Sequence, residues 1–598
     1  MPLIEALFPA PWWTPLSYKY ERALPGGLRL SAPLGRGSRI GLTADPGRAS
    51  DFDEALAKPI TALIDETPPV PEDLRRLIKW FGETFFIGEG LAMKNILPSK
   101  FFTEEKLAEA PLFRKGTFSA ESLYDTEFKN RRAFYMELLE KADGSSLLLF
   151  PEIKAAESFW KSLPPACQAE GQFWPQGPAK QWKLWKAMRE GKLRFVVGSP
   201  GAAFLPAPKL SLIVMDEENQ GSWRTQNHPG FHMRTLMGMR AIYAGASFVT
   251  GGSMPSSKGF LRAEPECLER SNDKKVIFVS LKDSSASEFA GIKDTLPLSD
   301  ALQRETAAVR RAGGWALWLL DRKGYAVELA CEECGGTVKC ARCGSAMRWE
   351  EKERRLCCLE CGEKMPLPEK CPNCGGLLLA GQRPGIEALY ERAEGALKGI
   401  YKTILLPQSS GDKLPEASEL LEKYPGGGLL IGTKKLLTLC DGLSPALIGW
   451  IDADAEARGQ GYDAGARAYA TLWESLWRGT AEEKSRRIVV QSRRPGKGWQ
   501  EGLTRGWGSF WKRELKEREE WELPPFVPMI KITMPRASAA AFEKKLSDTE
   551  LEFWSSEENS CEFWVRTKRF GELRALLAPF FDIKSARKGF PAVLLYLE

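Results

Sequence analysis

Short runs of apolar residues alternate with longer amphipathic stretches through the middle of the chain. Between residues 111 and 270 these runs have the length expected of parallel strands buried on both faces, at 146–150, 193–197, 210–215 and 246–250. The pattern recurs further along, at 275–281, 315–320, 429–432, 446–451 and 487–491. Because strands that alternate with helices form parallel sheets, the pattern predicts two α/β units.

The two ends of the chain differ from this middle. Proline and glycine punctuate the first hundred residues, which predicts a small β-rich domain, and a helical pattern begins at Pro71. The last part of the chain has the pattern of a small α+β domain. The fold class is therefore α/β multidomain, with predicted segments at 1–100, 111–270, 275–330 continued at 381–510, 331–380 within them, and 520–598.

Composition narrows the class of protein. A chain of 598 residues predicts about three to five domains. It has no run of about 18 apolar residues, and the N-terminal residues lack a basic segment before an apolar one, so we expect a cytoplasmic protein without a membrane span. The net charge of +6 permits nucleic-acid binding. With only His228 and His232, a His-based triad or a His-rich metal site is nearly excluded.

Cysteines are the strongest chemical signal, because eight of them form Cys-x-x-Cys pairs within a short segment. The pairs are Cys331/Cys334, Cys340/Cys343, Cys358/Cys361 and Cys371/Cys374. Each pair can supply two thiolates to one tetrahedral ion, so the segment predicts two structural Cys₄ zinc sites. Disulfides are disfavoured in a reducing cytosol, and an iron–sulfur cluster is the weaker alternative. Cys357 is interpreted as a bystander.

Glycine follows the second cysteine of every pair, at Gly335, Gly344, Gly362 and Gly375. A tight turn at these points aims backbone amides at sulfur. Four thiolates also close the coordination shell, which argues against a catalytic ion.

A second pattern lies at residues 212–218, where an apolar strand ends in three acids. In nucleotide-hydrolysing motors, an acid in the position of Asp216 holds Mg²⁺ and the next, here Glu217, orients water. Acids after a strand are common, so this pattern alone is weak. Its neighbours along the chain decide its interpretation.

The chain resembles, over nearly its whole length, the PriA family of primosomal replication-restart helicases (primosomal protein N-prime, superfamily 2). The matching motifs are 150–153, 216–219, 252–256, 321–325 and 523–526, together with the cysteine spacing. The resemblance implies two RecA-like helicase lobes, with a zinc insertion in the second, and a protein that acts as a monomer. It also implies ligand sets. Zinc 1 takes Cys331, Cys334, Cys371 and Cys374, and zinc 2 takes Cys340, Cys343, Cys358 and Cys361.

Departures from the family bear on ATP and Mg²⁺. The resemblance aligns the phosphate loop with residues 115–122, where Lys115 and Ala120 stand at the two required glycine positions, Glu121 replaces the lysine and Ser122 follows. Reversing one charge beside a phosphate is worth about 4 kcal/mol at intermediate dielectric. Of two motif arginines, Arg478 remains and Ala481 replaces the other. Because an arginine finger contributes about 10³–10⁵ in rate, we expect ATP-driven 3′–5′ unwinding to be reduced or lost.

The same resemblance implies DNA contacts. Residues 1–100 are similar to a domain that binds the 3′ end of a nascent strand, and the loop after Glu218 is similar to an aromatic-rich loop that senses single strands. The candidate DNA-binding residues are Ser17, Tyr18, Arg36, Arg39, Trp223, Arg224 and Phe231. For each residue of the first domain the alternative is a plain surface position, and for the loop it is packing between the lobes.

Together these features predict a protein that recognises stalled or branched DNA forks. Its expected partners are branched and single-stranded DNA, primosome proteins and single-strand-binding protein, with two zinc ions. Two alternatives stay open: an active ATP-dependent helicase with a rebuilt ATP site, and a zinc-ribbon interaction scaffold.

Overall fold

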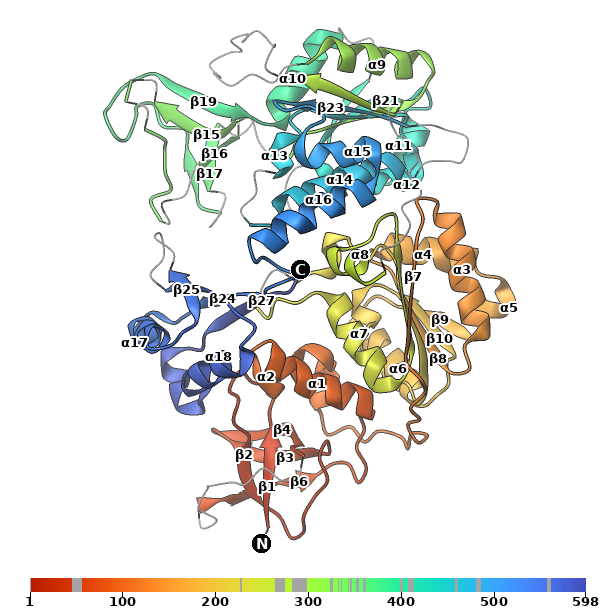
Figure 1. The fold of residues 1–598 in the computed structure, drawn as a ribbon, viewed down its shortest axis with the longest axis vertical. Coiled ribbons are helices and arrows are strands. Elements are labelled where there is room, and N and C mark those ends of the chain that lie inside the picture. Colours follow the sequence, from red (N-terminus) through yellow and green to blue (C-terminus); the bar gives the residue numbers. More distant parts are fainter. Residues whose placement is uncertain are drawn as a thin grey trace. The chain divides into compact units, whose positions relative to one another are not determined.

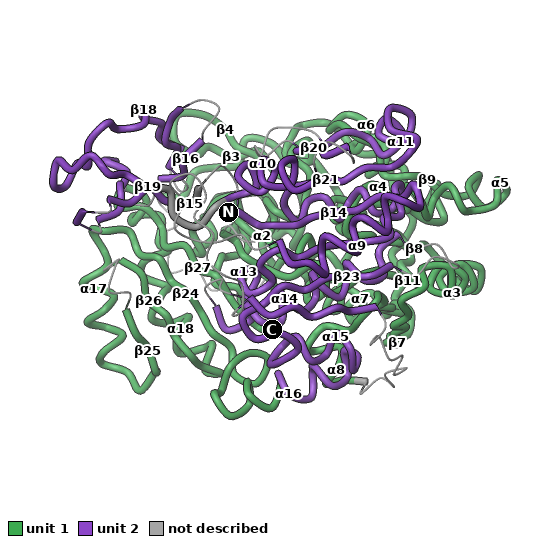
Figure 2. Tube along the Cα trace, turned by 90° about the horizontal axis from the view of Figure 1, so that it is seen from above, with its two compact units in different colours: residues 1–265, 515–598 green, residues 266–514 purple. Residues whose placement is uncertain are grey.

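The computed structural model describes residues 2–598, apart from 46–55, 226–227, 264–274, 282–297, 323–325, 332, 335, 343, 345–346, 351–353, 359–361, 398–401, 407–413, 458–460, 480–485 and 556–560. The chain divides into two compact units (Figure 2). One comprises residues 1–265 and 515–598, and the other comprises 266–514. Figure 1 labels their elements.

The first unit opens with a six-stranded sheet in the order β5-β2-β1-β4-β3-β6. Its strands are β1 (Leu3–Leu7), β2 (Leu16–Lys19), β3 (Arg29–Leu34), β4 (Gly37–Thr43), β5 (Lys58–Pro59) and β6 (Ala62–Leu63). Helices α1 (Glu72–Thr84) and α2 (Gly88–Ile96) follow. The helix predicted from Pro71 is thus confirmed. It begins with two acids that suit the positive end of the helix dipole.

A parallel sheet forms the middle of this unit, in the order β7-β12-β11-β8-β10-β9. Its strands are β7 (Ser119–Tyr124), β8 (Ser145–Leu149), β9 (Gly171–Phe173), β10 (Phe195–Gly198), β11 (Leu210–Met215) and β12 (Ser247–Gly252). Helices α3 (Phe128–Lys141) and α4 (Ile153–Ser162) pack on one face. Helices α6 (Pro178–Arg189) and α7 (Met233–Ala244) pack on the other. The four strands predicted here are confirmed, whereas β7 and β9 were not predicted.

The last residues return to this unit as a four-stranded antiparallel sheet in the order β25-β26-β24-β27. Its elements are β24 (Met529–Thr533), α17 (Arg536–Ser547), β25 (Glu552–Ser555), β26 (Glu562–Arg566), α18 (Phe570–Leu577) and β27 (Ala592–Tyr596). This is the split β-α-β arrangement, and it confirms the predicted α+β end of the chain.

The second unit contains another parallel sheet, in the order β13-β23-β22-β14-β21-β20. Its strands are β13 (Val276–Ser280), β14 (Trp315–Leu319), β20 (Thr403–Leu405), β21 (Gly428–Gly432), β22 (Leu447–Trp450) and β23 (Arg487–Ser492). Its helices include α9 (Asp300–Arg311), α10 (Ile386–Leu397) and α14 (Ala464–Trp477). All five strands predicted for this unit are present, because buried parallel strands carry a continuous apolar run.

The cysteine-rich segment leaves this second sheet after β14 and rejoins it before α10. It forms a five-stranded sheet in the order β18-β17-β16-β15-β19. The strands are β15 (Ala326–Cys331), β16 (Met347–Glu350), β17 (Arg355–Cys358), β18 (Lys364–Pro366) and β19 (Leu379–Pro384). Two parallel α/β sheets with a cysteine-bearing insertion in the second are therefore the architecture of the protein.

Candidate functional site

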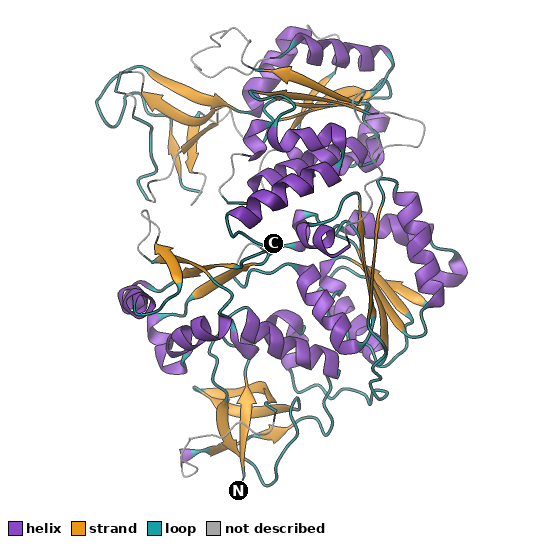
Figure 3. Ribbon diagram, viewed as in Figure 1, coloured by secondary structure: helices purple, strands orange, loops and turns teal. Residues whose placement is uncertain are grey.

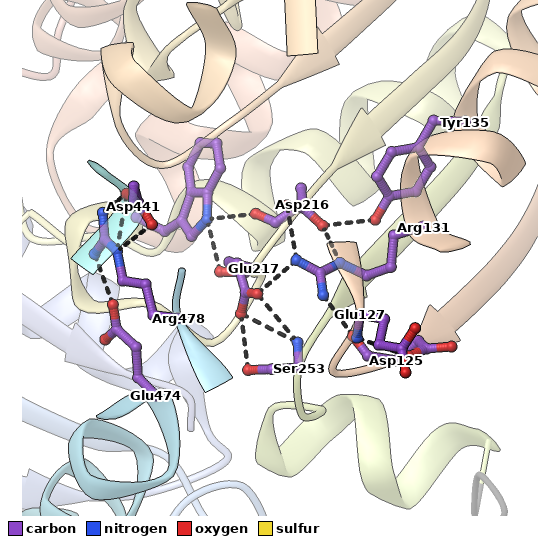
Figure 4. A network of polar contacts seen from close by, with 11 residues as sticks. Asp125, Glu127, Arg131, Tyr135, Asp216, Glu217, Ser253, Asp441, Glu474 and Arg478 are labelled. Atoms are coloured by element: carbon purple, nitrogen blue, oxygen red, sulfur yellow. Dashed lines mark hydrogen bonds and ion pairs between the residues drawn. The ribbon is translucent and has the colours of Figure 1, made fainter. Parts of the chain in front are cut away.

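The acids at the end of β11 are paired with an arginine from helix α3. Arg131 Nε lies 2.8 Å from Asp216 Oδ1, and Arg131 Nη2 lies 2.7 Å from Glu217 Oε1 (Figure 4). The hydroxyl of Tyr135, one turn further along α3, also donates to Asp216 Oδ1 at 2.8 Å. The side chains of Arg131 and Asp216 are only 4% and 3% exposed. The candidate Mg²⁺-binding acid is thus buried against a permanent cation.

Electrostatics favour the ionised pair. Burial lowers the pKa of Arg131, but the carboxylates of Asp216 and Glu217 outweigh it and hold that pKa above its usual value. Burial together with the Asp216 charge raises the pKa of Tyr135 well above its ordinary value, so its hydroxyl stays a donor. Mg²⁺ binds through carboxylate oxygens. Both oxygens of Asp216 already accept hydrogen bonds, from Arg131 and Tyr135.

Glu217 is committed in the same way. Its carboxylate accepts from the backbone amide and the hydroxyl of Ser253, each at 3.2 Å, at the end of neighbouring β12. Its backbone has φ 46°, a left-handed conformation that is uncommon for a residue with a side chain. Burial raises the pKa of Glu217, and the Arg131 cation opposes that rise. The carboxylate of Glu217 therefore links the end of β11 to the end of β12.

The third acid belongs to a buried network. Glu218 accepts from the Tyr124 hydroxyl at 2.6 Å and lies 3.1 Å from Arg234 Nε. Arg234 in turn pairs with Glu598. Glu218 is fully buried. Through Arg234 it links the end of β11 to Glu598.

The predicted phosphate loop at residues 115–122 is wrong in position. Glu121 and Ser122 lie within strand β7, where they pair with Val249 and Thr250 of β12. A phosphate loop joins the end of a strand to the start of a helix. The connection with that topology is residues 125–127, between β7 and α3. It has no glycine and carries two acids, so it presents negative charge where a triphosphate needs amides and a lysine.

Arg131 and Tyr135 are the residues that the sequence analysis missed. They lie on the buried side of α3, one turn apart. Arg131 also donates to the backbone carbonyl of Asp125, in the connection between β7 and α3. A buried arginine among apolar positions of a helix is the one signal that could have marked it, because buried arginines need a charged partner.

In the second unit, Arg478 is held by acids of its own unit. Its Nη2 lies 2.9 Å from Asp441 Oδ2, and its Nη1 lies 2.7 Å from Glu474 Oε1 (Figure 4). Its side chain is 12% exposed. Ala481 lies outside the described residues. The guanidinium predicted to remain from an arginine-finger motif is therefore already neutralised by two carboxylates.

Four cysteines of the insertion converge on one point. The sulfurs of Cys331, Cys334, Cys371 and Cys374 all lie within 4.8 Å of one another. Cys331 and Cys374 are 3.6 Å apart, and Cys334 and Cys371 are 3.8 Å apart. A tetrahedral zinc ion with Zn–S bonds of about 2.3 Å requires sulfurs about 3.8 Å apart. The geometry therefore fits a structural zinc ion held by these four residues.

Backbone amides support these sulfurs. Asn373 N donates to Cys371 Sγ and Gly376 N donates to Cys374 Sγ, each at 3.4 Å. Such contacts stabilise thiolates and orient them toward a cation. Gly375, with φ 74°, makes the turn that the sequence predicted after the second cysteine.

For the second predicted zinc site the structure describes half of the ligands. Cys340 and Cys358 are buried, while Cys343 and Cys361 lie outside the described residues. Gly344 N donates to the carbonyl of Cys340 at 2.9 Å, as Gly375 N donates to that of Cys371. Gly344 also has φ 75°. The two turns have the same form, and the second zinc site stays a prediction.

The candidate residues for a DNA 3′ end have mixed positions. Tyr18 is 4% exposed, and its hydroxyl donates to the Pro33 carbonyl at 2.9 Å. This burial leaves the ring of Tyr18 little surface for DNA, and its place among the DNA-binding candidates stays a prediction. Ser17 Oγ donates to Glu5 at 2.7 Å. Arg36 and Arg39, in and beside the β3–β4 turn, are exposed as phosphate contacts require.

The aromatic residues after Glu218 are packed inside the first unit. Trp223 and Phe231 are 1% and 7% exposed. Trp223 Nε1 donates to the carbonyl of Glu217 at 3.0 Å, and Phe231 packs edge-on against Phe81. The prediction that these rings stack on bases is therefore wrong. They pack within the first unit, whereas the alternative had been packing between the two lobes. Arg224 donates to the backbone oxygen of Glu598 at 3.1 Å.

Comparison with known proteins adds to this geometry. Residues 5–98 match a family model described as a 3′DNA-binding domain of PriA. The replication restart protein PriA of Bacillus subtilis is 23% identical over 452 residues, which is 71% of this chain and 54% of that protein. PriA of Treponema pallidum is 22% identical over 90% of this chain and 88% of its own length. PriA of Borreliella burgdorferi is 23% identical, over 94% and 88% respectively.

This chain is similar to PriA proteins over most of its length. The similarity to the PriA proteins runs through both parallel sheets as well as the N-terminal domain.

Solved structures give weaker likenesses. RecG bound to a three-way DNA junction aligns with 72% of this chain and 46% of its own, at 11% identity and a TM-score of 0.34. A DEAD box protein of Methanococcus jannaschii aligns with 76% and 91%, at 12% identity and a TM-score of 0.28. Among the described residues, every helix is too short or too polar to cross a bilayer.

Proposed function

We propose that this protein acts in replication restart by binding stalled or branched DNA forks, without ATP-driven unwinding. The observation that carries the second half of the proposal is the ion pair of Arg131 with Asp216 and Glu217. The match of residues 5–98 to a 3′DNA-binding domain and the PriA relatives support the first half.

The chemical argument concerns charge at the ends of β7 and β11. A nucleotide with Mg²⁺ needs free carboxylate oxygens for the metal and amide donors for the phosphates. Here Arg131 neutralises the carboxylates, and residues 125–127 offer two acids in place of a glycine-rich loop. ATP hydrolysis would need Arg131 to leave a buried pair, which costs several kcal/mol.

The remaining parts fit a protein that recruits others. The four-thiol cluster would hold one structural zinc ion in the insertion. Cys340, Cys343, Cys358 and Cys361 would hold the second. By analogy with PriA proteins, we propose that this protein acts as a monomer in the cytoplasm and brings primosome proteins and single-strand-binding protein to the fork.

Hydrolysis is the first test. We expect no ATP turnover above background when the purified protein is mixed with forked DNA whose nascent strand ends in a 3′-hydroxyl, although the fork itself is bound. Bacillus subtilis PriA under the same conditions is the positive control. Robust turnover by this protein would overturn the proposal and favour a rebuilt ATP site.

The exposed arginines of the N-terminal domain give a second test. Changing Arg36 and Arg39 together to alanine should weaken fork binding roughly tenfold. It should also reduce the slope of log affinity against log salt concentration by the amount expected for about two phosphate contacts. Fluorescence anisotropy at several salt concentrations measures both. Arg22→Ala, an exposed arginine outside the β3–β4 hairpin, is the matched control. Unchanged affinity and slope in the double variant would place the phosphate contacts elsewhere.

A further inference from the structure

The edge of the C-terminal sheet is in contact with the loop that follows the acids of β11. This loop is described at residues 224–225 and 228–232. Strand β27 is the last strand in the sheet order and leads to the terminus marked C in Figure 3. Gly230 of the loop forms an isolated parallel bridge with Leu594 of β27. A Cβ atom at position 230 would lie 2.6 Å from Leu594 Cδ2, so this close approach depends on glycine.

Both histidines of the chain lie in this loop and contact the last residues. His228 Nδ1 lies 3.1 Å from the amide nitrogen of Val593 and 3.0 Å from its carbonyl oxygen. His232 Nδ1 caps α7 by accepting from the backbone amide of Arg234 at 3.2 Å, and it lies 3.8 Å from Glu598 Oε1. A ring nitrogen that accepts a hydrogen bond carries no proton, so neutral rings fit the contacts with these two amides.

Glu598 is the acid held by this loop and by the start of α7. Its side chain is 6% exposed and pairs with Arg234, while Arg224 donates to its backbone oxygen at 3.1 Å. Burial raises the pKa of Glu598, but the charge of Arg234, together with those of His232 when protonated, Lys258 and Arg224, holds that pKa far below its usual value. Glu598 therefore stays ionised over the range in which histidines titrate.

Protonation of either histidine works against these contacts. Burial lowers the pKa of His228, and the carbonyl of Val593 opposes that fall. Burial lowers the pKa of His232 to about 4; the charge of Glu598 opposes the fall, and those of Arg234, Arg224 and Lys258 add to it. On a protonated ring Nδ1 is a donor, so the amides of Val593 and Arg234 lose their acceptor.

The direction of the pH effect follows from these shifts. The ordinary pKa of histidine is 6.5, whereas that of His232 in its contacts is about 4. Between these values the closed arrangement binds fewer protons than an open one. The stability that the contacts contribute is therefore complete above about pH 6.5 and is lost as the pH falls toward 4.

We propose that residues 593–598 form a latch on the loop after β11, and that this latch opens when His228 and His232 take up protons. Opening releases Arg224 and Arg234 from Glu598 and frees the edge of β27. It leaves the two neighbouring sheets folded, because their cores contain neither histidine. The latch is a property of the first unit and does not depend on the proposed function.

Hydrogen–deuterium exchange of the full chain measures this opening directly. Between pH 7 and pH 5, the protection of peptides from residues 224–232, corrected for the intrinsic exchange rate, should fall at least about tenfold. Peptides from β8 and β11 should keep their protection over the same range. The experiment contains no DNA, so its result is separate from any test of fork binding.

Matched variants remove the titration without removing the hydrogen bonds. An asparagine amide lies near the position of Nδ1, does not titrate and is a good N-cap, so His228→Asn with His232→Asn should keep the loop protected at both pH values. Glu598→Gln should lower protection of the loop already at pH 7, because it removes the charge that pairs with Arg234. Glu543→Gln, at an exposed position on α17, should have no effect.

The histidine rings give an independent measurement. Because the chain has two histidines, each single asparagine variant assigns the remaining ring signal, and NMR then follows its titration. We expect both rings to titrate below the ordinary value, with His232 the lower. Four results would each overturn the inference: rings that titrate at 6.5, equal loop protection at pH 7 and pH 5, the same acid effect in the asparagine double variant, or loss of protection throughout β8 and β11.

Discussion

Changing Asp216 to alanine should lower the free energy of unfolding of the first unit by about 3–5 kcal/mol. The change leaves the Arg131 guanidinium, 4% exposed, without the carboxylate that compensates its burial. In a working motor the same acid serves metal binding, and its loss mainly affects turnover. Here the effect should fall on stability, measured by urea denaturation and by resistance to limited proteolysis.

A surface pair provides the control for this result. Glu170 and Arg194 lie 2.6 Å apart with side chains 52% and 38% exposed, so Glu170→Ala should cost less than about 1 kcal/mol. The double variant Asp216→Ala with Arg131→Met should recover part of the loss, because it removes the buried charge. An Asp216→Ala protein as stable as the wild type would contradict a structural role for this ion pair.

Replacing Cys371 by serine should remove one zinc ion and unfold the part of the insertion that it holds. Structural zinc contributes about 10–16 kcal/mol of apparent binding free energy, and a ligand set of three thiolates loses much of it. Elemental analysis should give two zinc ions per wild-type chain and one per variant chain. Limited proteolysis should cut the variant within the insertion first.

The matched variant is Cys357→Ser. Cys357 is half-buried, next in sequence to Cys358 and outside the four-thiol cluster. The Cys357→Ser protein should therefore keep both zinc ions. Wild-type protein with far fewer than two ions, or a Cys371→Ser protein that keeps both, would contradict the assignment of these thiols.

The sequence predicted the two parallel sheets because most of their strands carry a continuous apolar run. Strand β11, for instance, runs over Leu210–Met215 as expected. Strand β7 escaped prediction because it lies at the sheet edge and carries polar, exposed residues such as Ser119 and Glu121. That omission also misplaced the phosphate loop, since the strand-to-helix connection could not be located without its strand.

Side-chain environment was harder to predict than the fold. The sequence alone does not distinguish a tryptophan that stacks on a base from one that packs in a core. Trp223 packs in the core of the first unit. The partner of Asp216 lies 85 residues away, on a helix whose register no local pattern fixes. The cysteines were different, because paired spacing is itself a constraint on geometry.

The cation beside Asp216 is a covalent part of helix α3, so it has no dissociation rate and no dependence on concentration. A metal–nucleotide complex at the same strand ends would come and go with the energy state of the cell. We therefore expect the conformation of this protein to be the same at high and low concentrations of ATP. On the proposed function, it should depend only on the structure of the DNA that the protein binds.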